Sequence, residues 1–311
     1  MEIFRKVRFA APLAAIAIGL VASSASKPVR ADGDETEKRE RCATRLSIGL
    51  LGKSPDAALT SAANPQDQVD AMLLDAVFVE RFARFTNSQM NPQPGESVAE
   101  DASYTLSKYV LTNKLPWSDL FVGAYDVTTA VAPAPDGLGY FRSVAWMRRY
   151  AGNEENGYRL SAAYRMLQNT TGLELTATTN VQGVDLTATG RQATACRGCH
   201  YESWFALDKV AKILSRRKGQ NANMTFLAPT EGPQQILGAQ TIADDKQLLT
   251  ALVASENFRV NACRLAFKYL YGRIENTCEA QVFERCVDAF AKDHTMQSAV
   301  AVIAKDPTFC Q

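Results

Sequence analysis

Histidine is scarce in this sequence: only His200 and His294 occur among 311 residues. This scarcity excludes metal centres built from several histidines, and cytochromes that carry several bis-histidine haems. No histidine precedes residue 200, so histidine-based acid–base catalysis is excluded for the N-terminal part of the chain. A large excess of one charge is lacking too, because 34 basic and 33 acidic residues leave a net charge of +1. The charge balance therefore predicts no nucleic-acid partner.

The N-terminus lacks a hydrophobic run long enough to cross a bilayer. Its apolar stretch, residues 10–22, contains Pro12 and is about 13 residues long, whereas a membrane-spanning helix needs about 20. Basic residues precede this stretch and small residues follow it, which predicts a signal peptide over residues 1–31 and no stable membrane anchor. Without residues 1–31 the net charge falls to −3. A periplasmic or secreted protein is expected, in a compartment where disulfides persist.

The apolar periodicity of the remaining chain predicts a mainly α fold. Asn64-Pro65 is a helix start, with a capping residue followed by proline. The apolar residues behind it share one helical face: Val69, Met72, Leu73, Phe78, Phe82 and Phe85. Further helices are predicted over residues 98–112, 116–121, 159–167, 202–217, 244–255, 261–271, 279–291 and 295–304. Residues 32–40 are charged and poor in apolar side chains, so a flexible entry segment is expected there.

One segment has a different composition and indicates a domain boundary. Residues 169–195 hold eight threonines and three glycines, which favours an extended linker with short strand pairing. We place the boundary inside this segment. The prediction is an N-terminal helical domain over residues 32–180 and a second domain over residues 181–311.

The second domain contains the one strong chemical motif, C-x-x-C-H at Cys196, Cys199 and His200. This pattern is the attachment signature of a c-type haem. Two thiols about one helical turn apart can form thioethers with the two vinyl groups of one porphyrin, and the adjacent imidazole can bind the iron as proximal ligand. Gly198 leaves room where the backbone passes close to the macrocycle. The motif predicts one covalent haem c and a small helical cytochrome c-like domain.

Three other interpretations of the motif compete with haem attachment. A thioredoxin-like redox pair needs a βαβ setting, which the surrounding sequence does not supply. A zinc site needs a second C-x-x-C pair, and the later cysteines are not spaced in that way. A structural disulfide does not require His200. Haem attachment is therefore the favoured interpretation.

The sixth ligand of the iron is left open by the sequence. Met224 is the favoured candidate, because it lies in a polar loop, residues 219–229, 24 residues after His200. His294 is the second candidate, and an open or water-bound position is the third. The other methionines sit among apolar residues at helical spacing, where methionine usually fills a core: Met72, Met90, Met147, Met166 and Met296.

Five segments of the chain have a pattern of their own: LLGKSPD (50–56), DAMLLDAVFVERFARFTN (70–87), YVLTNKLPWSDLFVG (109–123), CRGCHYESWFALDKVA (196–211) and SENFRVNACRLAFKYLYGR (255–273). With these segments the chain resembles secreted planctomycete and myxobacterial cytochrome c domain-containing proteins. The resemblance covers most of residues 42–309 and implies helical domains that surround one haem. This chain departs from those relatives where Tyr201-Glu202-Ser203-Trp204 replaces their methionine-containing segment after the motif. Because this segment contains no methionine, the methionine ligand of those relatives has no counterpart directly after the motif in this chain.

Five cysteines lie outside the motif. Cys263, Cys278, Cys286 and Cys310 fall within the last 50 residues, which suggests two disulfides between the terminal helices. Three pairings of these four are possible. Cys42 is left over, either as a free thiol or paired with one of the four.

The sequence supports three functions. The favoured one is an exported electron carrier with one haem and a redox partner protein. The first alternative is a peroxidase-like haem enzyme with an open distal site. The second is a non-catalytic partner-binding module in which the haem is structural. A single C-x-x-C-H motif argues against a di-haem peroxidase.

Overall fold

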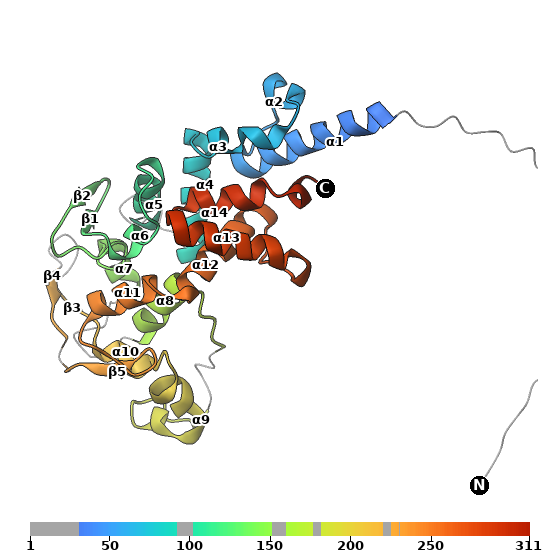
Figure 1. The fold of residues 1–311 in the computed structure, drawn as a ribbon. Helices are drawn as coiled ribbons and strands as arrows, with labels where there is room; N and C mark the ends of the chain where they lie inside the picture. The colour runs from blue at the N-terminus through green and yellow to red at the C-terminus, as the bar shows by residue number, and fades with distance from the viewer. Residues whose placement is uncertain (1–30, 92–101, 151–159, 177–181, 220–224, 230) are drawn as a thin grey trace, which may run out of the picture.

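The computed structural model describes residues 31–91, 102–150, 160–176, 182–219, 225–229 and 231–311 (Figure 1). The prediction of a mainly α fold is confirmed, because helices make up most of these residues and the strands are short. The predicted signal peptide lies outside the described residues, apart from Ala31. None of the described helices is both long enough and apolar enough to cross a membrane.

The N-terminal helices begin and end at local capping residues. Asn64 Oδ1 accepts a hydrogen bond from the Gln66 amide at 3.3 Å, and Pro65 takes the first helical position as predicted. Asp75 caps a new helix at Val77, so the predicted single helix is divided into two. The elements of this part are α1 Ala31–Leu46, η1 Ser47–Leu51, α2 Ala57–Ser61, η2 Pro65–Gln68, α3 Val69–Met72, α4 Ala76–Met90, α5 Ala102–Thr112 and α6 Asp119–Val122.

The prediction of a flexible entry segment over residues 32–40 is wrong, because these residues belong to helix α1. The helix runs through residues 31–46, and Figure 1 shows its N-terminal end extending away from the rest of the helices. Ion pairs at helical spacing join Lys38 to Glu35 and Arg41 to Glu37, which favours helix in a charged sequence. Cys42, in the last turns of the helix, is 6% exposed and belongs to the core. The anchored C-terminal end of the helix therefore orders a segment whose composition alone suggested flexibility.

The middle of the chain carries short helices and three two-stranded antiparallel hairpins. The helices are α7 Val144–Tyr150, α8 Leu160–Thr171, η5 Gly190–Gln192, α9 Thr194–Arg197, η6 Gly198–Glu202 and α10 Leu207–Lys212. The hairpins are β1 Tyr125–Val127 with β2 Val131–Pro133, β3 Arg216–Lys218 with β4 Thr225–Leu227, and β5 Gln234–Ile236 with β6 Gln240–Ile242.

Two predictions for this middle part are wrong. Residues 169–171 form the last turn of α8 rather than linker, because the Thr170 and Thr171 hydroxyls bond to carbonyls one turn earlier, at 2.6 and 2.7 Å. The rest of the linker contains no strand among its described residues. The helix predicted over residues 202–217 is interrupted at Ser203 and ends at Lys212, and Arg216 instead belongs to strand β3.

The C-terminal helices follow the predicted positions closely, except that the helix predicted over residues 261–271 begins five residues earlier, at Glu256. Asp244, Ser255 and Thr295 each accept a hydrogen bond from a backbone amide three residues further on. The elements are α11 Asp245–Val253, α12 Glu256–Tyr271, η8 Thr277–Glu279, α13 Ala280–Asp293, α14 Met296–Ala304 and η9 Pro307–Cys310. Gly272 ends α12 with a φ of 70°, a left-handed conformation that glycine adopts without strain.

Helices from both ends of the sequence share one hydrophobic core. Figure 1 shows the C-terminal helices α12–α14 beside the N-terminal helices α3 and α4. The Tyr269 ring of α12 lies 4.9 Å from the Phe82 ring and 5.3 Å from the Phe85 ring of α4. The Tyr269 hydroxyl also donates to the Leu50 carbonyl at 2.9 Å. The division at residue 180 stays a prediction, and the stretches on its two sides pack together.

The two disulfides differ in part from the expected pairing. Cys263 and Cys286 join α12 to α13, as the clustering of cysteines in the terminal helices suggested. Cys42 pairs with Cys310 and so joins α1 to η9 across a separation of 268 residues. Of the five cysteines outside the motif, Cys278 is left unpaired with an exposed thiol, whereas Cys42 takes the second outcome left open for it, a disulfide with one of the four later cysteines. The second disulfide therefore reinforces the contact between the two ends of the described chain.

Candidate functional site

The C-x-x-C-H motif lies on two consecutive helical turns, α9 and η6, at the lower end of the molecule in Figure 1. Ala193 precedes the first turn in an extended conformation, and Ser203 ends the second. Residues three apart on a helix share a face, so Cys196 and Cys199 face the same side. Cys196 is half-buried and Cys199 is exposed, and neither thiol forms a disulfide. Both thiols are therefore available for a covalent bond to a ligand.

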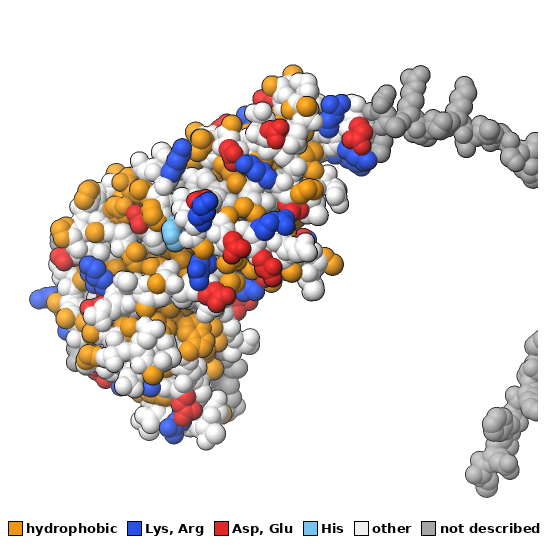
Figure 2. Space-filling model, in the orientation of Figure 1, with side chains coloured by type: hydrophobic (Ala, Val, Ile, Leu, Met, Phe, Trp, Pro, Cys, Tyr) orange, Lys and Arg blue, Asp and Glu red, His pale blue; other side chains and the backbone are white. Residues whose placement is uncertain are grey.

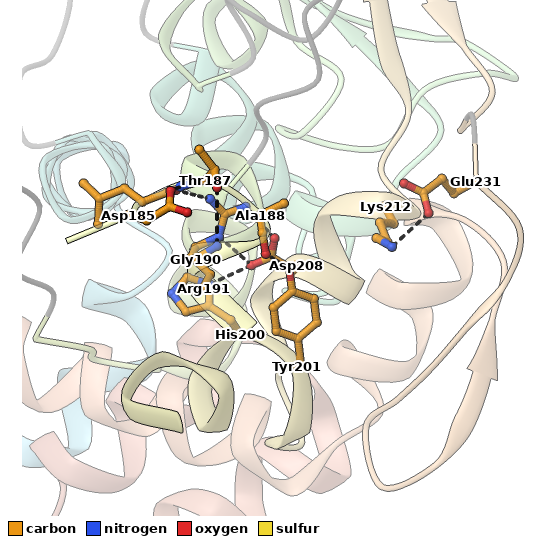
Figure 3. A network of polar contacts seen from close by, with 11 residues as sticks. Asp185, Thr187, Ala188, Gly190, Arg191, His200, Tyr201, Asp208, Lys212 and Glu231 are labelled. Carbon is orange, nitrogen blue, oxygen red and sulfur yellow. Dashed lines mark hydrogen bonds and ion pairs between the residues drawn. The ribbon is translucent and has the colours of Figure 1, made fainter. Parts of the chain in front are cut away.

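The His200 imidazole is held by Asp208 of α10. Its Nδ1 lies 2.7 Å from Asp208 Oδ2, and the His200 side chain keeps 21% of its surface exposed (Figure 3). A carboxylate on one ring nitrogen fixes the orientation of the ring and increases the basicity of the other nitrogen. This arrangement leaves Nε2 for a metal ligand bond.

Asp208 is in turn held by Arg191 of η5. Arg191 donates to both carboxylate oxygens, from Nη2 at 2.6 Å and from Nε at 3.0 Å. The two side chains are only 9% and 7% exposed, so this is a buried, two-pronged ion pair. Burial by itself would raise the pKa of Asp208, but the hydrogen bonds from Arg191 and His200 outweigh it and lower the pKa below its ordinary value. Asp208 is therefore an anion in contact with the imidazole.

Further contacts hold the turns around the motif in place. The Tyr201 hydroxyl donates to the Ala188 carbonyl at 2.9 Å. Arg197 forms an exposed ion pair with Glu202 at 2.6 Å, across the junction of α9 and η6. The Leu237 amide of the β5–β6 turn donates to the Trp204 carbonyl at 2.8 Å. The motif is thus supported from η5, α10 and the β5–β6 hairpin.

Exposed apolar side chains lie in the segments directly before and after the motif. Val184, Leu186 and Trp204 are 44%, 42% and 38% exposed. Leu186 is joined to the site directly, because its carbonyl accepts a hydrogen bond from Arg191. A side chain added at Gly198 would meet no atom within 4 Å, so the space beside that backbone is open.

These features fit a haem. The faces of a porphyrin are apolar, so exposed apolar side chains beside two thiols and an oriented imidazole suit its binding. In Figure 2 hydrophobic side chains reach the surface between the C-terminal helices and the lower end that carries α9, whereas charged side chains gather over α12–α14. The described residues contain no group of three His, Cys, Asp or Glu side chains arranged to hold a bare metal ion.

The candidate distal ligands are not brought to the motif by the described structure. Met224 lies outside the described residues, directly before β4. His294 follows α13, where its carbonyl accepts a hydrogen bond from the Trp117 amide at 2.7 Å. Figure 1 shows α13 and α14 well apart from α9. The five remaining methionine candidates are core residues, as predicted: Met72, Met90, Met147, Met166 and Met296.

Sequence reasoning identified His200 but missed Asp208 and Arg191. A weak signal for Asp208 exists in the sequence, because this acid stands next to Leu207, at the edge of the apolar face of α10. A charged residue on such a face is buried only with a partner. No comparable signal marks Arg191, which reaches Asp208 only through the folded chain.

Comparison with protein-family models, curated proteins and solved structures gives no match for this chain. The resemblance to secreted cytochromes therefore stays a prediction.

Proposed function

We propose that this chain is an exported c-type cytochrome that carries electrons through one covalent haem. The proposal rests on one observation. Two thiols outside any disulfide, Cys196 and Cys199, lie in the same short segment as the His200 imidazole, whose Nδ1 is held by Asp208. Each thiol would add across one vinyl group, with the sulfur bonding to carbon and the thiol hydrogen passing to the neighbouring carbon. His200 Nε2 would bind the iron on the proximal side. The bound haem supplies one-electron chemistry.

Export belongs to the same proposal. The predicted signal peptide and the two disulfides, Cys42–Cys310 and Cys263–Cys286, are compatible with an oxidising compartment. The apolar surface around Val184, Leu186 and Trp204 would cover part of the haem and leave an edge open to a redox partner protein. Haem attachment to C-x-x-C-H motifs needs free thiols, and neither of the two disulfides uses Cys196 or Cys199.

The test is the mass of the denatured protein from a host that attaches haem to exported chains. We expect a mass increase equal to one haem, and the pyridine-haemochrome spectrum of a haem that is held by two thioether bonds. A variant with Cys196→Ser and Cys199→Ser is expected to show no covalent haem while keeping the fold, because serine is nearly isosteric with cysteine and neither thiol is fully buried or bonded in a disulfide. An unmodified mass from the unaltered chain would refute the proposal.

A haem enzyme with an open distal site is the second candidate, and one observation favours it. The Asp208 carboxylate on Nδ1 makes the His200 imidazole a stronger donor to iron than a neutral partner would. A stronger donor lowers the reduction potential. The electron carrier needs a filled distal position on the iron and the enzyme needs an open one, so the distal ligand decides between them.

We expect Met224→Ala to convert a low-spin ferric spectrum to a high-spin one, because the variant removes the favoured distal ligand. The matched control is His294→Ala, which is expected to leave the spectrum unchanged because α13 lies apart from the motif in Figure 1. A change in His294→Ala alone would transfer the distal role to His294. A high-spin spectrum in the unaltered chain would instead favour the enzyme.

A further inference from the structure

All three side-chain nitrogens of Arg191 donate hydrogen bonds. Nη2 and Nε donate to the two carboxylate oxygens of Asp208, at 2.6 and 3.0 Å, and Nη1 donates to the Leu186 carbonyl (Figure 3). Leu186 precedes the motif in the chain and Asp208 follows it. The side chains of Arg191 and Asp208 are 9% and 7% exposed, so the guanidinium is fixed in a place that excludes most water.

One oxygen of Asp208 accepts from two groups. Oδ2 lies 2.7 Å from His200 Nδ1 and 3.0 Å from Arg191 Nε. The guanidinium therefore contacts the same carboxylate oxygen that orients the imidazole. Two donors on one oxygen compete for its electron density, and the one that carries a full positive charge is the stronger competitor.

This sharing determines how strongly His200 can donate to a metal. A carboxylate on Nδ1 increases the basicity of the imidazole. A guanidinium on the same carboxylate draws negative charge away from the imidazole, and burial of the ion pair leaves that effect little screened by water. A weaker proximal donor favours ferrous over ferric iron. Arg191 thus opposes the effect of Asp208 on the reduction potential.

We propose that Arg191 sets the reduction potential of the haem, because it offsets part of the Asp208 charge and so limits donation from His200 to the iron. Arg191 is a positioning residue, since it acts through Asp208. The inference rests on the proposed function and deepens it. An uncompensated Asp208 favours the low potential that suits the haem enzyme, whereas Asp208 paired with Arg191 favours the electron carrier.

The test is the midpoint potential of the exported haem protein, from a spectroelectrochemical titration. Arg191→Gln keeps a hydrogen-bonding side chain but removes the charge. It is expected to lower the ratio of ferrous to ferric haem about tenfold at a fixed potential, which is a fall of about 59 mV for a one-electron couple. Arg191→Lys keeps the charge and is expected to retain most of the potential.

The matched control is Arg197→Gln, which makes the same chemical change within the motif itself. Arg197 pairs with Glu202 at 2.6 Å, and the two side chains are 59% and 56% exposed. Water and salt screen this exposed pair, so the ratio of ferrous to ferric haem is expected to change less than about twofold. A shift as large as that of Arg191→Gln would show that any nearby positive charge has the same effect, and would overturn the proposal.

The double variant Arg191→Gln with Asp208→Asn tests whether Arg191 acts through the carboxylate. It leaves no unpaired buried charge, so it is expected to fold even if Arg191→Gln is too unstable to measure. Its potential is expected to lie above that of the unaltered chain, because the carboxylate on Nδ1 is gone. A potential below that of the unaltered chain would show that Arg191 acts independently of Asp208, and would overturn the proposal.

A second measurement needs no haem. In a ¹⁵N-labelled chain with Cys196→Ser and Cys199→Ser, the NMR signal of the His200 Nδ1 proton is expected to move downfield in Arg191→Gln, because an uncompensated carboxylate holds that proton more tightly. Arg197→Gln is expected to leave the signal in place. An unaltered chain without covalent haem would refute the proposed function and this inference with it. An attached haem with the same potential in Arg191→Gln would overturn this inference alone.

Discussion

Replacing His200 by alanine is expected to abolish the native haem spectrum while leaving the haem attached. The thioether bonds depend on Cys196 and Cys199, so the mass of the denatured variant should still include one haem. No other histidine lies near the motif, because His294 belongs to the end of α13. The iron would lose its proximal imidazole, and the visible spectrum should become that of a weakly ligated, high-spin haem. Mass spectrometry and absorption spectroscopy of the same sample separate attachment from ligation.

The control for this experiment is Tyr201→Phe, at the next position of the chain. It removes the hydroxyl that donates to the Ala188 carbonyl and also interacts with Asp208, but it leaves the His200 imidazole and its contact with Asp208 in place, so the native spectrum should persist. Added imidazole is expected to restore a low-spin spectrum to His200→Ala but to leave Tyr201→Phe unchanged. His200→Ala with the unaltered visible spectrum would show that His200 is not the ligand.

The helix boundaries that depend on neighbouring residues could be predicted from the sequence. Asn64, Asp244 and Thr295 cap helices at the expected places, because a cap needs only its own side chain and an amide two or three residues further on. The same local rule could have predicted the break after Met72, where Asp75 caps α4. Capping residues within a long apolar periodicity therefore carry information that periodicity alone does not.

The failed helix prediction over residues 202–217 has both a local and a tertiary cause. Ser203 accepts a hydrogen bond from the Ala206 amide at 3.0 Å, a local arrangement that competes with helix continuation. Further on, Arg216–Lys218 pairs with Thr225–Leu227 as a strand. The pairing partner lies beyond the segment, so the amphipathic pattern of residues 202–217 could not reveal it. Because the helix is interrupted at Ser203, Trp204 lies outside α10 and is exposed.

The candidate site was likewise predictable only in part. The C-x-x-C-H spacing identifies Cys196, Cys199 and His200, because thioether attachment constrains residues within one short segment. Arg191 and Asp208 are 17 residues apart and meet only because η5 packs beside α10. The disulfide between Cys42 and Cys310 depends in the same way on the contact between α1 and η9. Sequence spacing could not choose between these long-range partners.

Replacing Arg191 by methionine is expected to destabilise the protein by about 3–5 kcal/mol. Methionine keeps much of the apolar stem of arginine but removes the guanidinium that binds both Asp208 oxygens. The Asp208 side chain is 7% exposed, so its carboxylate would stay buried in contact with His200 but without the guanidinium that balances its charge. The measurement is the free energy of unfolding from urea titration followed by circular dichroism.

The matched control is Arg197→Met, which breaks the ion pair with Glu202. Both side chains of that pair are more than half exposed, at 59% and 56%, so the expected loss is less than about 1 kcal/mol. The two variants make the same chemical change within six residues of each other and differ in burial. If the two variants lose the same free energy of unfolding, burial of the Asp208 carboxylate is not the cause of the loss.

A double variant, Arg191→Met with Asp208→Leu, separates the unpaired charge from the other contacts of Arg191. Removing both charges eliminates the buried carboxylate, so most of the lost stability should return. The double variant still lacks the hydrogen bond from Arg191 to the Leu186 carbonyl, and any remaining deficit measures that contact together with packing. His200 Nδ1 would also be without its carboxylate, so the reduction potential of the attached haem should rise. A double variant as unstable as Arg191→Met would place the loss in packing rather than in the charge of Asp208.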